Sequence, residues 1–217
     1  MDRQSMQKIR VWDFPTRVFH WTLLVLFVLL FVTAYAGQMD AHAAMGQAVL
    51  VLVLFRLVWG FVGSQTSRFH DFVKGASSIR SYLASGQPAT LGHNPLGGVM
   101  VVALLATILV QALSGMFASD GIAFDGPFAH WITSVASNAI TRLHVSLAYV
   151  IAGLVAVHVV AVLLHWMLRR ENLIVPMFSG KKWVRAGTAQ PHFASTAIAF
   201  AIVLLTAIAL VAVRRFF

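Results

Sequence analysis

Apolar residues dominate five long stretches of the chain, and polar and charged residues gather between them. An apolar run needs roughly 20 residues to cross a bilayer as a helix. The pattern therefore predicts an all-α integral membrane protein with five membrane-spanning helices. The five runs lie at about residues 18–36, 43–62, 96–117, 143–167 and 193–213.

The first of these runs shares features with a secretory signal peptide. Basic residues precede it, and Ala34-Tyr35-Ala36 resembles a cleavage site. However, the apolar core of a signal peptide is about 7–15 residues long, and this run is longer. We therefore expect the run to be kept as a spanning helix, with cleavage as the alternative.

The composition agrees with a membrane protein. Of the 217 residues, 59% are hydrophobic and only 11% are charged, whereas a soluble domain carries about 25% charged residues. The absence of cysteine excludes disulfides, thiolate metal sites, iron–sulfur clusters and covalent haem attachment. The net charge of +9 is spread between the apolar runs, so it indicates topology, and we expect no nucleic-acid partner.

The basic residues predict the orientation, because Lys and Arg favour the cytoplasmic side of a membrane. One set of helix ends holds 13 of the 16 basic residues, so we expect a multi-pass membrane protein with a cytoplasmic N-terminus. Five spans then place the C-terminus outside, where Arg214 and Arg215 run against the rule. The cytoplasmic set is Arg3, Lys8, Arg10, Arg17, Arg56, Arg68, Lys74, Arg80, Arg169, Arg170, Lys181, Lys182 and Arg185, and the outer set is Arg142, Arg214 and Arg215.

Two segments between the spans have helical amphipathic patterns. Residues 67–85 carry apolar side chains at helical spacing with basic residues between them, which fits a helix lying in the cytoplasmic interface. Residues 127–140 repeat the pattern on the outer side. Packing on the bundle and on lipid headgroups explains both segments, and the outer one is also a candidate docking surface for a partner protein.

Five of the nine histidines lie in apolar spans or at their ends, namely His20, His42, His144, His158 and His165. Ionisable residues inside a membrane are costly and are candidates for function. A hydrogen bond between helices or an anchor at the interface is the plainer interpretation of any one of them. His165, next to Trp166, suits an anchor best.

The spacing of these histidines predicts two pairs at two depths. His144 and His158 are 14 residues apart, which is about 21 Å along a helix and about 40° short of four turns, so both project from nearly the same face. His20 lies near the cytoplasmic side of the first span and His42 near the outer side of the second. We therefore expect His20 to face His158, and His42 to face His144.

Paired imidazoles suit a bis-histidine haem. A haem iron takes one axial nitrogen on each side of the porphyrin, and the apolar macrocycle fits between helices. Proton relays also use buried histidine, but normally with intramembrane Asp or Glu, and no span interior contains either residue. The spacing favours two non-covalent haem b groups, with His20, His42, His144 and His158 as metal ligands.

The same spacing resembles the bacterial cytochrome b561 family, which includes the b-type cytochrome subunits of nickel–iron hydrogenases. The likeness covers roughly residues 10–182. It rests on Trp12-Asp13, Arg17-Val18-Phe19-His20-Trp21, His42 with Gly46 and Arg56, Gly92-His93-Asn94-Pro95-Leu96-Gly97, Leu143-His144, His158, and Leu168-Arg169-Arg170-Glu171-Asn172-Leu173-Ile174.

This resemblance implies a four-helix bundle that holds two haems through the four histidines. Members of the family commonly exchange electrons with the quinone pool on one side of the membrane and with a redox partner on the other. We therefore expect a diheme domain over residues 1–185 in the bacterial inner (plasma) membrane, followed by an extra transmembrane helix in 186–217 to which the resemblance assigns no role. The expected partners are the quinone pool and a protein of hydrogenase or cytochrome c type.

Further cofactor contacts are expected at the bundle ends. Haem propionates need cations, so Arg17 and Arg56 suit the cytoplasmic haem and Arg142 the outer one, with a topology signal alone as the alternative for each. His165 is about 10 Å below His158 along the helix. The resemblance suggests that it hydrogen-bonds or deprotonates a quinol there, and His93 is a second candidate for that role.

Three functions remain open at this point. The leading one is a diheme carrier between quinone and a redox partner. The second is a self-contained quinone-linked oxidoreductase that acts on a small molecule such as superoxide at the outer haem, and the third is a non-redox transporter or anchor. The sequence decides neither the direction of electron flow nor whether the chain forms a homo-oligomer.

Overall fold

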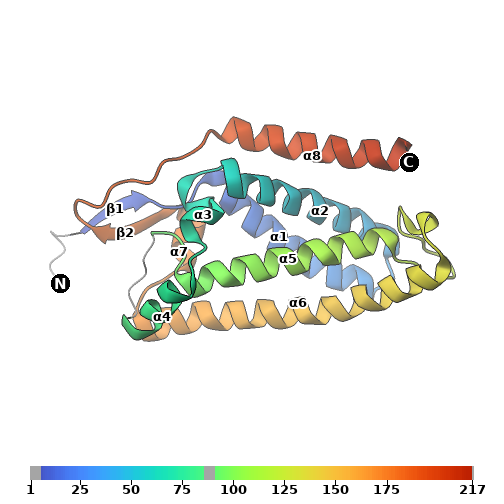
Figure 1. The fold of residues 1–217 in the computed structure, drawn as a ribbon, viewed down its shortest axis with the longest axis horizontal. Coiled ribbons are helices and arrows are strands. Elements are labelled where there is room, and N and C mark those ends of the chain that lie inside the picture. The colour runs from blue at the N-terminus through green and yellow to red at the C-terminus, as the bar shows by residue number, and fades with distance from the viewer. Residues whose placement is uncertain (1–5, 86–90, 217) are drawn as a thin grey trace.

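A computed structural model describes residues 6–85 and 91–216, and it is helical almost throughout (Figure 1). Arg3, used above as a topology signal, lies outside the described residues. The long helices are α1 (Phe14–Tyr35), α2 (Met39–Val62), α5 (Pro95–Phe117), α6 (Ser134–Arg169) and α8 (Thr196–Phe216). The short elements are η2 (Gln65–Ser67), α3 (Phe69–Phe72), α4 (Ala76–Ser85), η3 (Ala129–Trp131), α7 (Ile174–Ser179) and the strands β1 (Met6–Arg10) and β2 (Lys181–Arg185).

The five long helices match the five apolar runs, and each is long and apolar enough to span a membrane. Local capping explains where they begin. The Asp13 side chain accepts a hydrogen bond from the Thr16 amide, and a proline follows in the first turn, so α1 starts before its apolar run. Asn94 caps α5 in the same way. The fold is thus the predicted helical membrane bundle.

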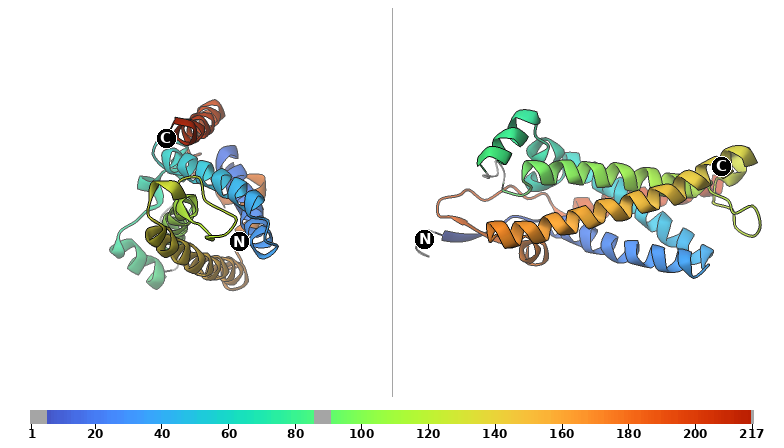
Figure 2. Two further views of the ribbon diagram at one scale, coloured as in Figure 1. Left: turned by 90° about the vertical axis from the view of Figure 1, so that its right-hand side faces the viewer. Right: turned by 90° about the horizontal axis from the view of Figure 1, so that it is seen from below.

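Helices α1, α2, α5 and α6 form the bundle, and α8 lies outside it along α2 (Figures 1 and 2). In α2, 39% of the apolar window is buried, against 6–11% in the other four long helices, because α2 packs on α1, α5 and α8. The remaining apolar surface needs an apolar solvent. The protein is therefore a multi-pass membrane protein.

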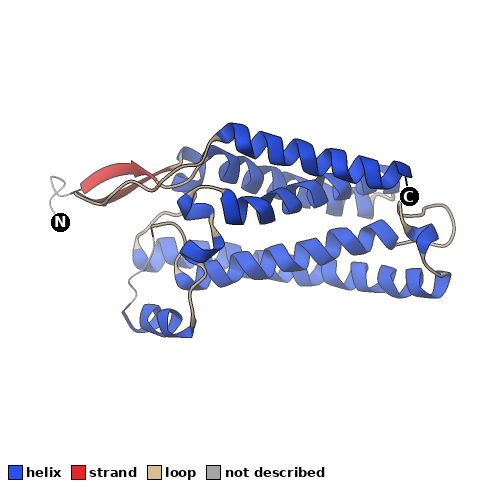
Figure 3. Ribbon diagram, turned by 45° about the horizontal axis from the view of Figure 1, so that its top comes forward, coloured by secondary structure: helices blue, strands red, loops and turns tan. Residues whose placement is uncertain are grey.

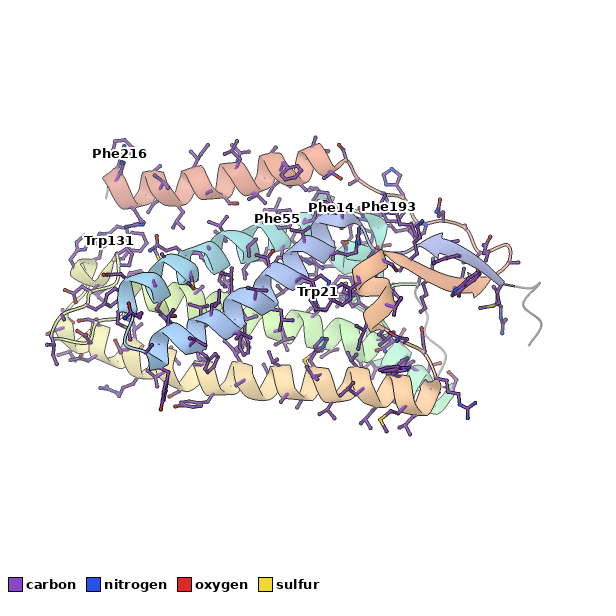
Figure 4. The ribbon with its side chains drawn as sticks, turned by 180° about the vertical axis from the view of Figure 1, so that it is seen from behind. Phe14, Trp21, Phe55, Trp131, Phe193 and Phe216 are labelled. Carbon is purple, nitrogen blue, oxygen red and sulfur yellow. The ribbon has the colours of Figure 1, made fainter. Side chains whose placement is uncertain are left out.

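The two ends of the bundle differ. We call the end that carries β1 and β2 the strand end, and the end that carries the connection at residues 118–133 the loop end (Figures 1 and 3). The N-terminus lies at the strand end and the C-terminus at the loop end, as five spans require. In Figure 4 the labelled Phe14 and Phe193 lie toward the strand end, and Trp131 and Phe216 lie at the loop end.

The amphipathic segments differ from single interfacial helices. The one at 67–85, at the strand end, is broken into α3 and α4 around Gly75. In the one at 127–140, at the loop end, residues 129–131 form only a 3-10 turn, and the chain from Ser134 onward is already the first part of α6. The side chain of Thr133 caps that helix by accepting from the Ala136 amide, so a capping residue divides the apolar pattern.

A small antiparallel sheet was not expected from the sequence. Strand β1 pairs with β2 in a register that places Lys8 opposite Trp183, and Ile9 opposite Lys182. Ile9 is buried with Val11 and Trp12 in a separate small core. Five-residue strands separated by 170 residues leave no local sequence signal, so only the folded chain brings them together.

Helix α8 is attached to the bundle near both of its ends. Before it begins, the Ala194 amide donates to the Ser64 hydroxyl at 3.1 Å, and the Gln65 amide donates to the His192 carbonyl at 3.0 Å. Near its end, Arg214 donates to the side-chain carbonyl of Gln47. The helix is therefore held along α2 by polar contacts as well as by apolar packing.

A buried carboxylate joins three segments at the strand end. Asp13 is 1% exposed. Besides capping α1, it accepts hydrogen bonds from Trp59 Nε1 and Ser67 Oγ, both at 3.1 Å. The Thr16 hydroxyl lies 2.7 Å from Ser67 Oγ and extends the network. One side chain thus fixes the start of α1 against the end of α2.

We predict that Asp13→Ala destabilises the protein by about 2–4 kcal/mol, because it leaves buried donors on Trp59 and Ser67 without an acceptor. The thermal unfolding midpoint of the purified protein in detergent measures this. Asp13→Asn is the matched control, since it keeps one acceptor oxygen and should cost less. Equal midpoints for Asp13→Ala and the parent chain would contradict the proposed importance of the network.

Candidate functional site

A cavity of about 1680 Å³ lies between the bundle helices and extends from the strand end to the loop end. His20, His42, His144 and His158 all line it. Pockets for single small ligands usually measure about 300–1,000 Å³, so this cavity has room for more than one large group. Its lining comes mostly from apolar residues of α1, α2, α5 and α6, and the lining residues include none from α8.

At the strand end, His20 of α1 faces His158 of α6. Their ring centroids are 6.5 Å apart and the rings are tilted by 57°. Trp21, which follows His20, stacks on Phe178 of α7 at 3.9 Å and donates to the Met177 carbonyl at 3.2 Å. Figure 4 shows Trp21 next to α7. This anchor fixes the first turns of α1, from which His20 projects.

At the loop end, His42 of α2 faces His144 of α6 with ring centroids 6.2 Å apart. His42 Nδ1 lies 3.0 Å from the Leu30 carbonyl, and His144 Nδ1 lies 2.9 Å from the Gln111 carbonyl. A carbonyl only accepts, so both Nδ1 atoms donate a proton, which leaves Nε2 of each ring as the nitrogen with a lone pair. The lone pair of His144 Nε2 accepts a hydrogen bond from the Gln111 side-chain amide at 3.2 Å, so a metal at this nitrogen would take the place of that amide.

The histidines thus meet in twos, in the pairs that the spacing predicted. Among residues 6–85 and 91–216, no three His, Cys, Asp or Glu side chains come close enough to hold a metal ion by themselves. An imidazole nitrogen binds a metal at about 2.0–2.1 Å. Two imidazoles on opposite sides of one metal therefore have ring centroids about 6.3 Å apart. Both pairs have nearly that separation, which suits axial ligation of a metal held in a planar macrocycle.

Small residues make room beside the rings. A Cβ added at Gly115 would lie 2.9 Å from His144 Cε1, so only glycine at that position leaves space for this ring. A Cβ added at Gly46, which lines the cavity, would meet nothing within 4 Å. Gly153 likewise has open space at its Cβ position, but it is not a lining residue.

The three candidate arginines have different surroundings. Arg56 is 2% exposed, lines the cavity and lies 5.3 Å and 5.9 Å from the rings of Phe69 and Phe72. Its Nη1 atom is buried and has no hydrogen-bond partner within the described chain. Arg17 instead donates to the Phe178 carbonyl on α7, and Arg142 is exposed; neither lines the cavity.

A polar cluster closes the strand end of the cavity. His165 Nε2 lies 2.9 Å from Glu171 Oε2, and Lys182 of β2 forms an ion pair with the other oxygen of Glu171. Burial alone would raise the pKa of the Glu171 carboxyl, but the hydrogen bonds from Lys182 and His165 lower it below its ordinary value. His165 therefore has a charged hydrogen-bond partner. The neighbouring Trp166 had suggested only that His165 is an anchor at the membrane interface.

His93, the second candidate for a quinol contact, also lines the cavity. Its ring packs at 4.8 Å from Trp12 and 4.5 Å from Phe72. Burial, with smaller contributions from Arg56, His158 and His20, lowers the pKa of His93 to about 3. The ring is therefore neutral at physiological pH.

Several residues of the site escaped the sequence analysis. Gln111 and Ser114 contact His144, and their signal was available, since both are polar residues within an apolar span. Glu171 stood in the motif at 168–174 and Lys182 among the basic residues, but neither pointed to their ion pair, because they lie in separate polar segments that only the fold brings together. Asp13 was noticed in the Trp12-Asp13 motif without its hydrogen bonds.

A helical membrane bundle with paired imidazoles facing one another across an apolar cavity has the form of a membrane cytochrome. The family model described as prokaryotic cytochrome b561 matches residues 11–180, and the chain belongs to this family. The protein is thus a transmembrane b-type cytochrome that takes part in electron transfer and binds haem b. The matched residues include both histidine pairs and end before β2 and α8.

Two curated relatives carry the name probable Ni/Fe-hydrogenase B-type cytochrome subunit. The relative from Bradyrhizobium diazoefficiens is 25% identical over 217 residues, covering 82% of this chain and 87% of the relative. The one from Rhizobium leguminosarum bv. viciae is 24% identical over 213 residues, covering 81% of this chain and 89% of the relative. No solved structure matches the chain.

The Glu171 ion pair makes a prediction about pH. Because the pKa of Glu171 is lowered in the folded protein, its contribution to stability is present above the ordinary value of 4.5 and is lost as the pH falls below it. Lys182→Met should therefore lower the melting temperature at pH 7 and change it progressively less as the pH approaches 4. The exposed neighbour provides the control, since Lys181→Met should have no such pH-dependent effect. A pH-independent difference would refute the assignment.

Proposed function

We propose that this cytochrome holds two haem b groups and carries electrons across the membrane between the quinone pool and a redox partner. His20 and His158 would ligate one haem, and His42 and His144 the other. The observation that carries the proposal is the presence of two facing imidazole pairs at metal-spanning separations on one large cavity. Each haem would supply a reversible one-electron valence change.

The residues present fit such a group. Gly46 leaves open space in the cavity lining, where a flat macrocycle can approach the backbone of α2. Arg56 has a buried Nη1 atom that needs an anionic or carbonyl partner, because a buried cation without one is costly. We propose that Arg56 binds a propionate at the strand end. The placement of Arg17 and Arg142 away from the cavity does not support the same role for them.

We further propose that quinone binds at the strand end of the cavity, next to His165. The ring of His165 holds a proton at Nε2 that Glu171 accepts as a hydrogen bond. This pair can move a proton between the cavity and the end of the bundle, while Lys182 orients the carboxylate. His93 is neutral and could accept a hydrogen bond from a quinol, although its aromatic neighbours leave it less open.

The distribution of basic residues supports the orientation of the proposed carrier. We propose that the strand end faces the cytoplasm of a bacterium, that the loop end faces the periplasm, and that the chain lies in the inner membrane. The names of the two rhizobial relatives favour a hydrogenase-type redox partner. Helix α8 lies outside the cavity, so we propose that residues 1–185 form the haem domain and that 186–217 add a peripheral helix.

The ligand assignment predicts which histidines belong together. The purified protein should contain two haem b per chain, both extractable by acid acetone. His20→Ala and His158→Ala should each damage the same spectral component, and the double variant should resemble either single one. His42→Ala and His144→Ala should damage the other component, which lies about 21 Å away along α6.

Pyridine haemochrome counts and low-temperature spectra measure this outcome. A haem content near zero per chain would refute the whole proposal, and a content near one would mean that one of the two histidine pairs does not bind haem. His165→Ala is the matched control, because it removes an imidazole from the same helix and should leave both low-spin components in place.

The proposed orientation has its own test. A reporter fused near residue 75 should be active as a cytoplasmic fusion, and one fused near residue 125 as a periplasmic fusion, because the two positions lie at opposite ends of the bundle (Figure 1). The reverse pattern would leave the histidine pairs intact but would exchange the membrane sides of the two haems.

A further inference from the structure

The two histidine pairs differ in their hydrogen bonds. At the loop end, both rings donate from Nδ1 to backbone carbonyls, His42 to Leu30 at 3.0 Å and His144 to Gln111 at 2.9 Å. At the strand end, His20 Nδ1 is buried without a partner in the described chain. Nor does any hydrogen bond join the His158 ring to the described residues. The loop-end rings therefore donate from Nδ1 to backbone carbonyls, and the strand-end rings make no such bond within the described residues.

Ser114 strengthens the loop-end arrangement. Its hydroxyl donates to the Gln111 carbonyl at 2.9 Å, so the proton of that hydroxyl is used. Its oxygen lies 3.1 Å from His144 Nδ1 and can therefore accept from the ring. Ser114 is 7% exposed, so bulk water does not compete for the contact. The His144 N–H group is thus shared between two acceptors on α5.

Such bonds change the metal chemistry of an imidazole. A ring that donates its outer N–H to a carbonyl becomes a more basic ligand at the opposite nitrogen. A more basic ligand favours the more positive, oxidised iron and lowers its reduction potential. By this effect alone, an iron at the loop end would be harder to reduce than one at the strand end.

The charges around the cavity act in the same direction. The lining residues at the strand end include three cations, Arg56, Arg169 and Lys182, against the single anion Glu171. At the loop end the charged lining residue in the described chain is an anion, Asp120. Cations favour the less positive, reduced iron and anions favour the oxidised iron, and Arg56 is the buried cation among the three.

We propose that the carbonyls of Leu30 and Gln111, together with Ser114, make the loop-end site the lower-potential haem site, and that Arg56 makes the strand-end site the higher-potential one. These are positioning groups that act through the ligands or through the field. The inference rests on the proposed bis-histidine ligation. An electron shared by the two sites then resides at the strand end, with at least a tenfold preference, equivalent to about 59 mV for one electron.

A redox titration of the purified haem-loaded protein, followed optically, tests this order. Two components should titrate separately, and the higher one should be the component that His20→Ala removes. Ser114→Ala should raise the reduction potential of the lower-potential component, by about threefold in its reduction equilibrium constant, because one acceptor of the His144 N–H is lost. Arg56→Gln should lower the reduction potential of the higher-potential component. Each substitution should therefore reduce the difference between the two potentials.

Ser146→Ala is the matched control. Ser146 lies on α6 two residues after His144, but its hydroxyl is exposed and donates to the Arg142 carbonyl, so neither component should move. If Ser114→Ala loses haem, redox-induced infrared difference spectra of the parent protein with isotope-labelled histidine provide the second readout. The imidazole modes that change with the lower component should be those of rings with a hydrogen-bonded Nδ1–H.

The outcomes separate this inference from the proposed function. Two low-spin haems with the order of potentials reversed, or a Ser114→Ala variant in which only the higher component moves, would overturn the inference and leave the proposed ligation standing. Infrared modes showing equal hydrogen bonding at both levels would overturn it as well. Fewer than two bis-histidine haems would overturn the proposed function itself.

Discussion

The rigid pitch of α6 sets the separation between the two histidine levels, and the rest of the site depends on it. Fourteen residues of helix keep His144 and His158 about 21 Å apart on nearly one face. Their partners come from α1 and α2, which run in opposite directions and are joined by a short turn. Because His20 and His42 each lie near the start of their own helix, the antiparallel arrangement places them at opposite levels.

The sequence predicts those features that depend on one helix at a time. Apolar length gave the five spans, and helical spacing gave the pairing of rings that the fold brings to 6.2–6.5 Å. Contacts between distant segments could not be predicted in this way. Trp59 donates to Asp13 across 46 positions, and Lys182 reaches Glu171 from a strand that pairs with β1. A periodic pattern along one segment does not predict such contacts, because each of the two residues is a common residue type in its own segment.

The surroundings of the arginines at the strand end also could not be predicted from the sequence. Arg17 and Arg56 were equivalent in sequence, as basic residues at the same end of the bundle. In the structure Arg56 is buried against the rings of Phe69 and Phe72, whereas Arg17 donates a hydrogen bond to the carbonyl of Phe178. The difference arises because α3 folds back over the end of α2, and α7 covers the start of α1. The sequence shows which charges are present, but only packing decides which of them reaches the cavity.

The pairing of β1 with β2 has a consequence for how the protein is made. Residues 6–10 are synthesised before their partner strand at 181–185, with four long helices between them in the chain. Closing so large a loop is slow compared with local helix formation. The N-terminal segment therefore waits unpaired while α1 to α6 enter the bilayer, and the sheet forms late. Once formed, the sheet joins the segment before α1 to the segment that follows α6 and α7.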